Sequence, residues 1–446
     1  MELDLSKIKN VHFIGIGGIG ISAVARMMLH DGKNVTGQDM QDGEVVRELQ
    51  KIGANITIGQ SYENIPKDTD LIVYTIAIDN YDPELAKKIK NRTDIPVKSY
   101  PQMLDIISRD KYTIAVSGTH GKTTTTAMIA QILCDSRNDP TVIVGSLLIG
   151  SHSNFIAGQS KYLVVEACEY RRSFLNINPK ILVITNIDAD HLDYYKDIED
   201  IKNAFHELAT KVPEDGFIVC NPDDENISDV LKNVKARIMN YYEFFNPDLK
   251  LKIPGIHNKK DAAAASAVAE ILGIQKNETE KALSAFPGTW RRFEYKGELS
   301  NGARVYDDYA HHPTEISSTL EGFRELYPKS DGWKITVVFQ PHLFSRTKLL
   351  LDDFAKCFTL ADTILLLPIY YAREEDDGTI SSKILSDEIN KYEDRSISEV
   401  FDSFETAEKR LQSMTLNKKD IIVTMGAGEA FKVGDKMLES GFYPQD

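Results

Sequence analysis

The chain is 446 residues long, which exceeds the usual size of one folded core and indicates two to four domains. Its 52 Lys and Arg residues against 67 Asp and Glu residues give a net charge of −15, which argues against nucleic acid or an anionic membrane as a partner. No apolar run approaches the ~20 residues that cross a bilayer, and the four cysteines lie far apart without a Cys-x-x-Cys pair, so we expect a cytoplasmic protein with unpaired thiols and no signal peptide.

The first part of the chain alternates apolar strands with helical patterns, which is typical of a parallel α/β sheet. The predicted strands are 11–15, 34–39, 55–59 and 70–75. Gly15, Gly17 and Gly20 form a Gly-x-Gly-x-x-Gly pattern after the first strand, and Asp39 stands where a ribose-binding acid would follow. The pattern predicts that a phosphorylated ligand approaches this backbone. Taken alone, it favours a nicotinamide-dependent oxidoreductase.

A phosphate-binding loop is predicted between a strand at 113–116 and a helical pattern at 124–134. A glycine-rich turn in this place presents backbone N–H groups and the positive end of a helix to an anion. Lys122 adds a cation for the β- and γ-phosphates, and Thr123 offers a hydroxyl to Mg²⁺. The common form of the loop would have a glycine at position 116, where this chain has Val116. We predict nucleoside triphosphate binding here, with an ordinary strand-to-helix turn as the alternative.

Two further α/β units complete the predicted fold. Apolar strands at 141–145, 162–167, 181–187 and 217–220 suit a sheet buried on both faces. An alanine-rich helix follows Asn258, Pro287-Gly288 marks a boundary, and strands at 334–339, 362–368 and 420–425 each precede a helical pattern. We therefore predict three consecutive α/β domains: a Rossmann-like domain at 1–109, a central P-loop ATPase domain with a mostly parallel sheet at 110–287, and a C-terminal Rossmann-like domain at 288–446.

Two nucleotide-compatible sheets on one chain suit an enzyme that binds a nucleotide-linked substrate at one sheet and a triphosphate at the other. Eight motifs in order along the chain resemble those of the Mur ligases, and among them those of the ligases that add L-alanine to UDP-N-acetylmuramate. The motifs are GIGGIGIS at 15–22, GTHGKTTT at 118–125, EACEY at 166–170, NIDADH at 186–191, GIHN at 255–258, RRFE at 291–294, DDYAHHPTE at 307–315 and FQPHLFSRT at 339–347.

The resemblance implies amide-bond synthesis coupled to ATP hydrolysis, in the formation of peptidoglycan precursors. The lactyl carboxylate of UDP-N-acetylmuramate would attack the γ-phosphate of ATP, and the amine of L-alanine would then attack the acyl phosphate. The implied cofactors are ATP and Mg²⁺, with two ions. The implied partners are these small-molecule substrates alone, for a protein that is a monomer or a homodimer.

For the ATP site, the resemblance implies a cradle, a metal site and contacts to the nucleoside. Catalytic roles fall to Lys122, Glu166, His191 and Arg292, with Thr123, Glu166 and His191 holding metal. Asn258 would read the adenine, Arg292 would reach the phosphates, and Asp308 would reach the ribose. The phosphate cradle would consist of Gly118, Thr119, His120, Gly121, Lys122, Thr123 and Thr124.

Plain structural roles are the alternatives at several of these positions. Glu166 has the alternative of a surface acid at a strand end, His191 that of a structural or helix-capping residue, and Asn258 that of a helix N-cap. The adjacent His311 and His312 have the alternative of helix-entry residues.

The resemblance also implies two sets of substrate-binding residues. The amino-acid pocket would consist of Tyr309, His311, His342 and Arg346, where a guanidinium can form a fork with the carboxylate of alanine. The nucleotide sugar would meet Gly17, Gly18, Ile19, Gly20 and Ser22 at its pyrophosphate, and Asp39, Ala77 and Ile78 at its nucleoside.

The chain departs from the family pattern at a few positions. Arg171 and Arg172 follow the EACEY motif where many members carry acidic residues, and their contacts stay open. Asp261 stands where the family usually has a second asparagine, which weakens any adenine contact assigned there. Leu343 stands at a position of the amino-acid pocket often held by arginine, which leaves selectivity for alanine over glycine or serine open. Cys168 is expected to be a buried structural thiol, because no base is placed beside it.

Two other functions remain possible from the sequence. One is the recycling ligase of the same superfamily, which attaches a tripeptide to UDP-muramic acid. The other, from a different class, is the NAD-dependent oxidoreductase favoured by the first domain alone, which leaves the phosphate loop unexplained.

Overall fold

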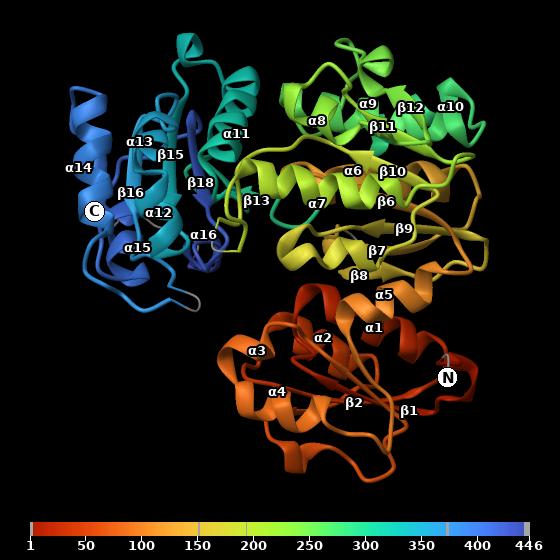
Figure 1. The fold of residues 1–446 in the computed structure, drawn as a ribbon. Coiled ribbons are helices and arrows are strands. Elements are labelled where there is room, and N and C mark those ends of the chain that lie inside the picture. Colours follow the sequence, from red (N-terminus) through yellow and green to blue (C-terminus); the bar gives the residue numbers. More distant parts are fainter. Residues whose placement is uncertain (1–2, 150–151, 193, 372–373, 441–446) are drawn as a thin grey trace. The chain divides into compact units, whose positions relative to one another are not determined.

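The computed structural model describes residues 3–149, 152–192, 194–371 and 374–440. These residues form three sheets, each covered by its own helices, which confirms the predicted succession of α/β units (Figure 1). By its internal contacts the chain divides into two compact units, one of residues 1–249 and 260–286 and the other of residues 250–259 and 287–446. The first two sheets share the first unit. Within the described part of the chain, no helix has the length and apolar character to cross a bilayer.

The first sheet is parallel throughout, in the order β3-β2-β1-β4-β5. Its order reverses direction between β1 and β4, the place where open α/β sheets bind ligands beyond the carboxyl ends of their strands. The strands are β1 Asn10–Ile14, β2 Asn34–Asp39, β3 Asn55–Ile58, β4 Leu71–Tyr74 and β5 Val97–Ser99, and the helices are α1 Ile19–His30, α2 Glu44–Lys51, α3 Ile78–Tyr81, α4 Pro83–Lys90 and α5 Tyr100–Ser108.

The second sheet has the order β12-β11-β10-β6-β9-β7-β8, and only β8 is antiparallel to its neighbour. The strand before the phosphate loop, β6, lies between β9 and β10, so the ends of all three meet at one edge. The strands are β6 Tyr112–Ser117, β7 Thr141–Leu148, β8 Ser153–Ile156, β9 Tyr162–Glu166, β10 Ile181–Ile184, β11 Phe217–Cys220 and β12 Arg237–Asn240. The helices are α6 Lys122–Asp135, α7 Ile198–Thr210, α8 Glu225–Val230, α9 Ile256–Ile271 and α10 Lys276–Ala285.

The third sheet has the order β13-β14-β18-β15-β16-β17, with β13 antiparallel at its edge. The strands are β13 Glu294–Glu298, β14 Arg304–Asp308, β15 Lys334–Phe339, β16 Thr363–Leu366, β17 Ser398–Val400 and β18 Asp420–Met425. The helices are α11 Pro313–Leu326, α12 Phe344–Leu349, α13 Leu351–Lys356, α14 Ser382–Tyr392, α15 Phe404–Gln412 and α16 Phe431–Glu439. Short 3₁₀ helices are η1 Leu5–Lys7, η2 Tyr62–Asn64, η3 Tyr170–Asn176, η4 Tyr241–Phe244 and η5 Lys329–Asp331.

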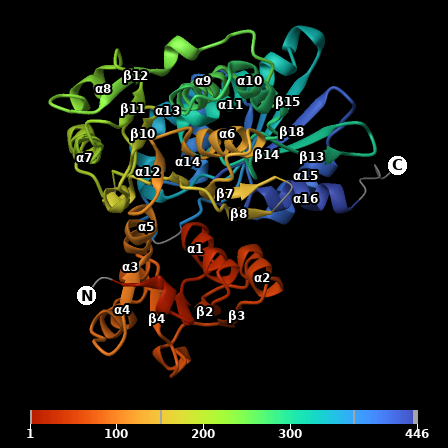
Figure 2. The same cartoon turned by 90° about the vertical axis from the view of Figure 1, so that its right-hand side faces the viewer.

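Helix α1 of the first sheet packs against the β7–β8 hairpin of the second, and both views place them side by side (Figures 1 and 2). The fully buried Asn154 of β8 donates from Nδ2 to Ser22 Oγ at 2.9 Å and also to the carbonyl of Ile19. The ring of Phe155 lies 6.3 Å from that of His30, two turns further along α1. The loop after β1 is therefore held from the central sheet as well as from its own.

A buried polar network fixes the middle of the first sheet. His12 Nδ1 lies 2.8 Å from Thr36 Oγ1, and His12 Nε2 lies 3.1 Å from Gln38 Nε2. Gln38 Oε1 accepts from Ser61 N and Asn64 Nδ2, so its amide nitrogen faces His12 and donates. His12 is then a neutral imidazole whose Nδ1–H donates to Thr36. Burial lowers the pKa of His12 to about 4.

This network predicts a pH-dependent stability. Between pH 6.5 and about 4 the unfolded chain binds a proton at His12 that the folded chain refuses, so folding weakens as pH falls. Relative to His12→Gln, wild-type protein should lose about 3 kcal/mol of unfolding free energy over this window. Urea titrations of both proteins from neutral pH downward measure the difference. Parallel pH profiles would show that His12 does not titrate differently in the two states.

Candidate active site

The phosphate loop joins β6 to α6 through two glycines with positive φ, +138° at Gly118 and +82° at Gly121. A Cβ on Gly118 would lie 2.0 Å from Thr185 Oγ1, and one on Gly121 would lie 2.4 Å from Asp261 Oδ1. Both the backbone conformation and the space therefore require glycine. The loop ends at the N-terminus of α6, where free N–H groups and the helix dipole attract an anion.

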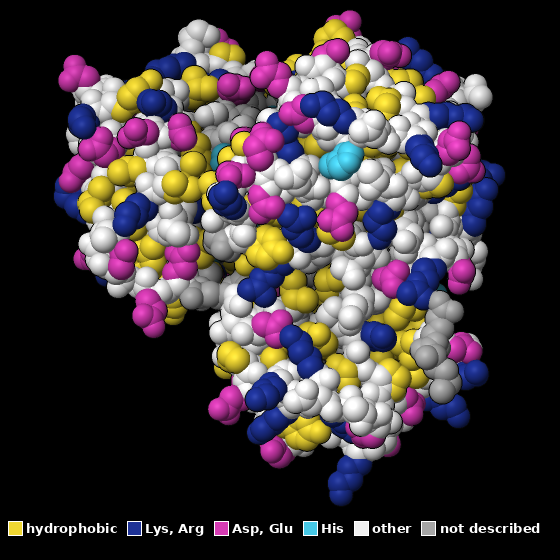
Figure 3. All heavy atoms as spheres, viewed as in Figure 1, with side chains coloured by type: hydrophobic (Ala, Val, Ile, Leu, Met, Phe, Trp, Pro, Cys, Tyr) yellow, Lys and Arg dark blue, Asp and Glu magenta, His cyan; other side chains and the backbone are white. Residues whose placement is uncertain are grey.

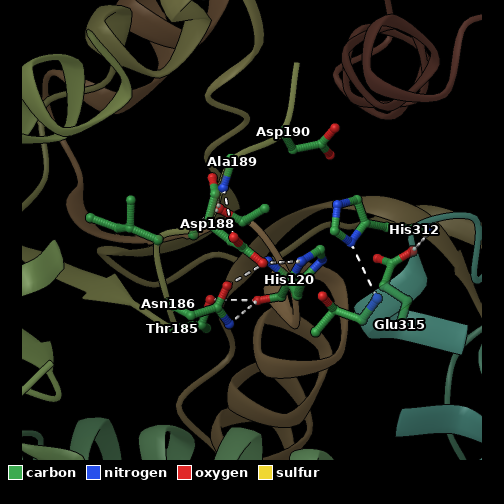
Figure 4. A network of polar contacts seen from close by, with 12 residues as sticks. His120, Thr185, Asn186, Asp188, Ala189, Asp190, His312 and Glu315 are labelled. Atoms are coloured by element: carbon green, nitrogen blue, oxygen red, sulfur yellow. Dashed lines mark hydrogen bonds and ion pairs between the residues drawn. The ribbon is translucent and has the colours of Figure 1, made fainter. Parts of the chain in front are cut away.

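The segment after β10 supports this loop from the side (Figure 4). Asn186 accepts the N–H of His120 at its side-chain oxygen at 2.9 Å and the N–H of Thr119 at its carbonyl at 3.0 Å. Its Nδ2 and the hydroxyl of Thr185 both donate to the carbonyl of His120. His120 Nε2 lies 3.7 Å from Asp188 Oδ2. The sequence analysis placed residues 186–191 in a motif, but gave no role to Thr185, Asn186 or Asp188.

Lys122 stands in the first turn of α6 with its ammonium group against the loop. Nζ donates to the carbonyls of Gly118 at 2.6 Å and Thr119 at 2.9 Å, and lies 3.0 Å from both carboxylate oxygens of Glu169. Burial acts to lower the pKa of Lys122, but nearby anionic groups, Glu169 foremost, outweigh it and raise that pKa above its ordinary value. The side chain is therefore a fixed cation at the place where a phosphate chain would lie.

Glu169 is a further residue of this site to which the sequence analysis gave no role. Its side chain is 4% exposed and lies between Lys122 and His191, whose Nε2 is 3.4 Å from Glu169 Oε1. Burial acts to raise the pKa of Glu169, but Lys122 and His191 outweigh it and hold that pKa below its ordinary value. Tyr195 donates its hydroxyl to the Glu169 carbonyl at 2.5 Å. The available signal was its place in the EACEY motif, three residues after the expected metal ligand.

Glu166 ends β9 and offers a carboxylate with one oxygen already oriented. Its Oε2 accepts the N–H of Gly145 at 2.7 Å. A Cβ at position 145 would lie 2.3 Å from Oε1, so this close contact requires glycine there. Mg²⁺ prefers oxygen ligands, and the carboxylate of Glu166 with the hydroxyl of Thr123 fits that preference. His191 offers a nitrogen, which suits Mg²⁺ less well. Its Nε2 lies 3.4 Å from Glu169 Oε1 and 3.9 Å from Asp190 Oδ2, and its ring lies 4.9 Å from that of Tyr170.

The loop between β1 and α1 carries the glycines predicted to approach a pyrophosphate. Gly15 has φ +73°, and Gly18 is the N-cap of α1, which begins at Ile19. The N–H of Gly17 donates to Asp39 Oδ2 at 2.8 Å. A Cβ on Gly20 would lie 2.7 Å from the ring of Tyr100. Asp39 therefore fixes the loop between β1 and α1 through its hydrogen bond with the Gly17 N–H.

Other residues predicted for the nucleotide sugar are partly withdrawn from solvent. Ser22 is fully buried, donates to the Ile19 carbonyl at 2.9 Å and accepts from Asn154, so its hydroxyl is engaged within the protein. Ala77 precedes α3, and Ile78, its first residue, is fully buried. The side chains of Ser22 and Ile78 therefore position the nearby backbone rather than face a ligand themselves.

The four residues predicted for an amino-acid pocket lie together in the second unit. The rings of Tyr309 and His311 are 5.3 Å apart, those of His311 and His342 are 5.8 Å apart, and Arg346 Nη1 is 3.1 Å from His342 Nδ1. Leu343, which replaces an arginine of the family pattern, has φ +71° just before α12. The cluster combines a guanidinium with three rings.

Arg292 and Asp308 have protein partners of their own. The Arg292 guanidinium lies 5.2 Å from the Tyr309 ring centre, and its Nη1 is 3.7 Å from Glu315 Oε1. The buried Asp308 accepts the N–H of Phe293 at 2.7 Å and that of Ala310 at 2.8 Å. Burial raises the pKa of Asp308 to about 6. Its carboxylate therefore ties two loops together.

Two of the plain alternatives are decided by the helices. Asn258 is inside α9, which begins at Ile256, so the helix N-cap alternative is wrong; its Nδ2 donates to the Pro254 carbonyl at 2.5 Å. His312 is the N-cap of α11 in a capping box with Glu315, which confirms the helix-entry role for this histidine.

The expectation for Cys168 is wrong, because this residue is exposed. Its neighbours Ala167 and Glu169 are both buried. All four cysteines are free, and Cys220 and Cys357 are buried as expected for structural thiols.

Three family models match the chain in order. They are the Mur ligase family catalytic domain at residues 10–112, the Mur ligase middle domain at 116–261, and the Mur ligase, glutamate ligase domain at 291–428. Curated relatives named UDP-N-acetylmuramate–L-alanine ligase extend over the whole chain. The relative from Acetivibrio thermocellus is 41% identical, covering 98% of this chain and 97% of its own, and the one from Clostridium tetani is 42% identical, covering 98% and 100%.

Solved structures agree with these matches. The crystal structure of the UDP-N-acetylmuramate–alanine ligase of Thermotoga maritima superposes with a TM-score of 0.79 at 28% identity, covering 97% of this chain and 99% of its own. A murein peptide ligase of Psychrobacter arcticus shares the fold, with a TM-score of 0.71 at 24% identity and coverage of 98% and 100%. The glycine-rich loops, the lysine-bearing phosphate loop and the matches along all three sheets lead to one conclusion: this chain belongs to the Mur ligase family.

Proposed function

We propose that this protein is an ATP-dependent ligase that joins L-alanine to the lactyl carboxylate of UDP-N-acetylmuramate, in peptidoglycan precursor synthesis. The observation that carries the proposal is the 41% identity over 98% of the chain to a relative named for this reaction. The phosphate loop with its buried Lys122 supplies the ATP-dependent part. The tripeptide-adding alternative is supported by likeness of fold alone. The oxidoreductase alternative offers no use for the phosphate loop.

The reaction requires activation of a carboxylate, which is a poor acyl donor at neutral pH. Transfer of the γ-phosphoryl group of ATP to this carboxylate creates a good leaving group, and the amine of alanine then displaces it as phosphate. Because both first reactants are anionic, the site must supply positive charge and hold them in line. Lys122 and the N-terminus of α6 supply this charge from the protein, and Arg292 is proposed to add to it.

Mg²⁺ would be held by Thr123 and Glu166, with His191 as a further ligand of a second ion, and it would neutralise charge on the phosphate oxygens. Backbone N–H groups of Gly118 to Thr124 would cradle the phosphates. Asn258 is proposed to meet the adenine and Asp308 the ribose. Since the Asp308 carboxylate already accepts two backbone N–H groups, we assign it chiefly to positioning the loop that carries Arg292.

The nucleotide sugar is proposed to bind at the loop after β1. Backbone groups from Gly17 to Gly20 would face the pyrophosphate, while Ser22 holds the helix that follows. Asp39, Ala77 and Ile78 would flank the nucleoside.

Arg346 is proposed to bind the carboxylate of L-alanine. Replacing it with alanine should raise the KM for L-alanine at least ~10-fold, since a charge-assisted fork is lost. The KM for ATP should change far less, and steady-state phosphate release at varied concentrations of each substrate measures both. Arg324, which pairs with Asp362 in the same domain, supplies the matched control as Arg324→Ala. Equal effects of Arg346→Ala on both KM values would contradict the pocket assignment.

The function itself is tested by phosphate release from ATP in the presence of UDP-N-acetylmuramate. The protein should respond to L-alanine over glycine, L-serine and the tripeptide. Turnover with the tripeptide alone would identify the recycling reaction instead. NADH oxidation with UDP-sugars and without ATP would support the oxidoreductase.

We further propose a cytoplasmic monomer or homodimer with domain boundaries near 109/110 and 287/288. The face drawn in Figure 3 intersperses acidic and basic side chains, as suits a protein whose partners are small molecules. Size measurement in solution and limited proteolysis test these assignments.

A further inference from the structure

Two consecutive arginines after the EACEY motif have left-handed backbone conformations that non-glycine residues rarely adopt. Arg171 has φ 52° and ψ 31°, and Arg172 has φ 55° and ψ 25°. Non-glycine residues persist in this left-handed region where their surroundings hold them in place. The contacts of the two side chains show what holds each one.

Arg171 reaches from the central sheet to the loop that follows β4. Its Nη1 donates to the carbonyl of Ile76 at 3.3 Å, and its Nη2 donates to Asn80 Oδ1 at 2.5 Å. Ala77 and Ile78, proposed to flank the nucleoside, lie between these two partners in the sequence. The guanidinium fork therefore holds both ends of the proposed nucleoside loop.

Arg172, in contrast, forms its ion pairs within the central domain. Its Nη2 donates to Asp200 Oδ1 at 2.6 Å, and its Nη1 lies 3.5 Å from Glu207 Oε2, both on α7. The two arginines thus share a backbone conformation and are adjacent in the chain, but within the described residues only Arg171 of the pair donates hydrogen bonds to the first domain.

Contacts continue from Arg171 to the phosphate loop. Its Cζ lies 5.7 Å from the Tyr170 ring centre, and that ring lies 4.9 Å from the ring of His191. His191 Nε2 is 3.4 Å from Glu169, which is 3.0 Å from Lys122 Nζ. A change in the nucleoside loop can therefore alter the position of Lys122 through packed side chains.

We propose that Arg171 is a positioning residue that couples binding of the nucleotide sugar in the first domain to binding of ATP at the phosphate loop. The inference rests on the proposed function. A ligand that orders residues 76–80 fixes Arg171, and with it the Tyr170–His191–Glu169 contacts that orient Lys122. By thermodynamic linkage each ligand then tightens the other by the same factor.

The test measures, by calorimetry, the Kd of a non-hydrolysable ATP analogue supplied with Mg²⁺. The Kd obtained with saturating UDP-N-acetylmuramate is compared with the Kd obtained without it. Wild-type protein should bind the analogue about fivefold or more tightly in the presence of the sugar nucleotide. In Arg171→Met and in Arg171→Lys, which cannot form the fork, this ratio should fall toward one. Asn80→Ala should lower the ratio too, and Arg171→Met/Asn80→Ala should lower it no further than Arg171→Met alone.

Arg172→Met is the matched control, and it should keep the wild-type ratio even if it unfolds at a lower temperature. An unchanged ratio in the Arg171 variants, an equal loss in Arg172→Met, or a wild-type ratio of one would overturn the inference while leaving the ligase assignment intact. Failure of wild-type protein to bind UDP-N-acetylmuramate at all would instead overturn the proposed function, and the inference with it.

Discussion

Replacing Lys122 with methionine should lower ATP-dependent phosphate release by on the order of 10²–10³-fold or more. Its ammonium is the buried cation of the phosphate loop, and methionine keeps an unbranched side chain one atom shorter while removing the charge. UDP-N-acetylmuramate should still bind, because its proposed site is on the first sheet. Phosphate release and calorimetric binding of the sugar nucleotide measure the two effects separately.

The matched control for this prediction is Lys161→Met, at an exposed lysine of the same domain that lies over the rings of Tyr112 and Tyr162. It should keep nearly full activity. Turnover within a few-fold of wild type in Lys122→Met would rule out the phosphate role of Lys122. Loss of sugar-nucleotide binding together with turnover would point instead to a general loss of folding.

Replacing Glu169 with leucine should destabilise the protein by about 3–5 kcal/mol, because it leaves the Lys122 ammonium buried without its carboxylate partner. The side chains are 14% and 4% exposed, so water can compensate for little of the loss. Urea unfolding measures the change in unfolding free energy. Glu169→Gln keeps a hydrogen-bond acceptor but not the charge, so its stability should lie between those of wild-type protein and Glu169→Leu.

The double variant Lys122→Met/Glu169→Leu separates charge from shape. With both charges removed, neither ion is left buried without its partner, and much of the stability lost in Glu169→Leu should return. A double variant as unstable as Glu169→Leu would show that Glu169 stabilises the fold through its other contacts, with His191 and Tyr195, rather than through Lys122.

The sequence analysis did not predict strands β5, β8, β12, β13, β14 and β17. β5, β8 and β17 are three or four residues long, too short for a periodic pattern to stand out. β14 ends in Asp307 and Asp308, which an apolar pattern excludes from a core strand. Asp307 is buried there because Arg291 pairs with it at 2.7 Å, an arrangement visible only once the chain is folded.

The sequence by itself determined the order of α/β units and the glycine-rich loops. Those features depend on local periodicity and on motifs whose residues are neighbours along the chain. Tertiary structure alone decided that Lys122 pairs with Glu169, that Asn154 donates a hydrogen bond to the hydroxyl of Ser22, and that Arg171 donates one to Asn80. These partners are 47, 132 and 91 positions apart, and which of them meet is set by strand order and helix packing, which no local pattern specifies.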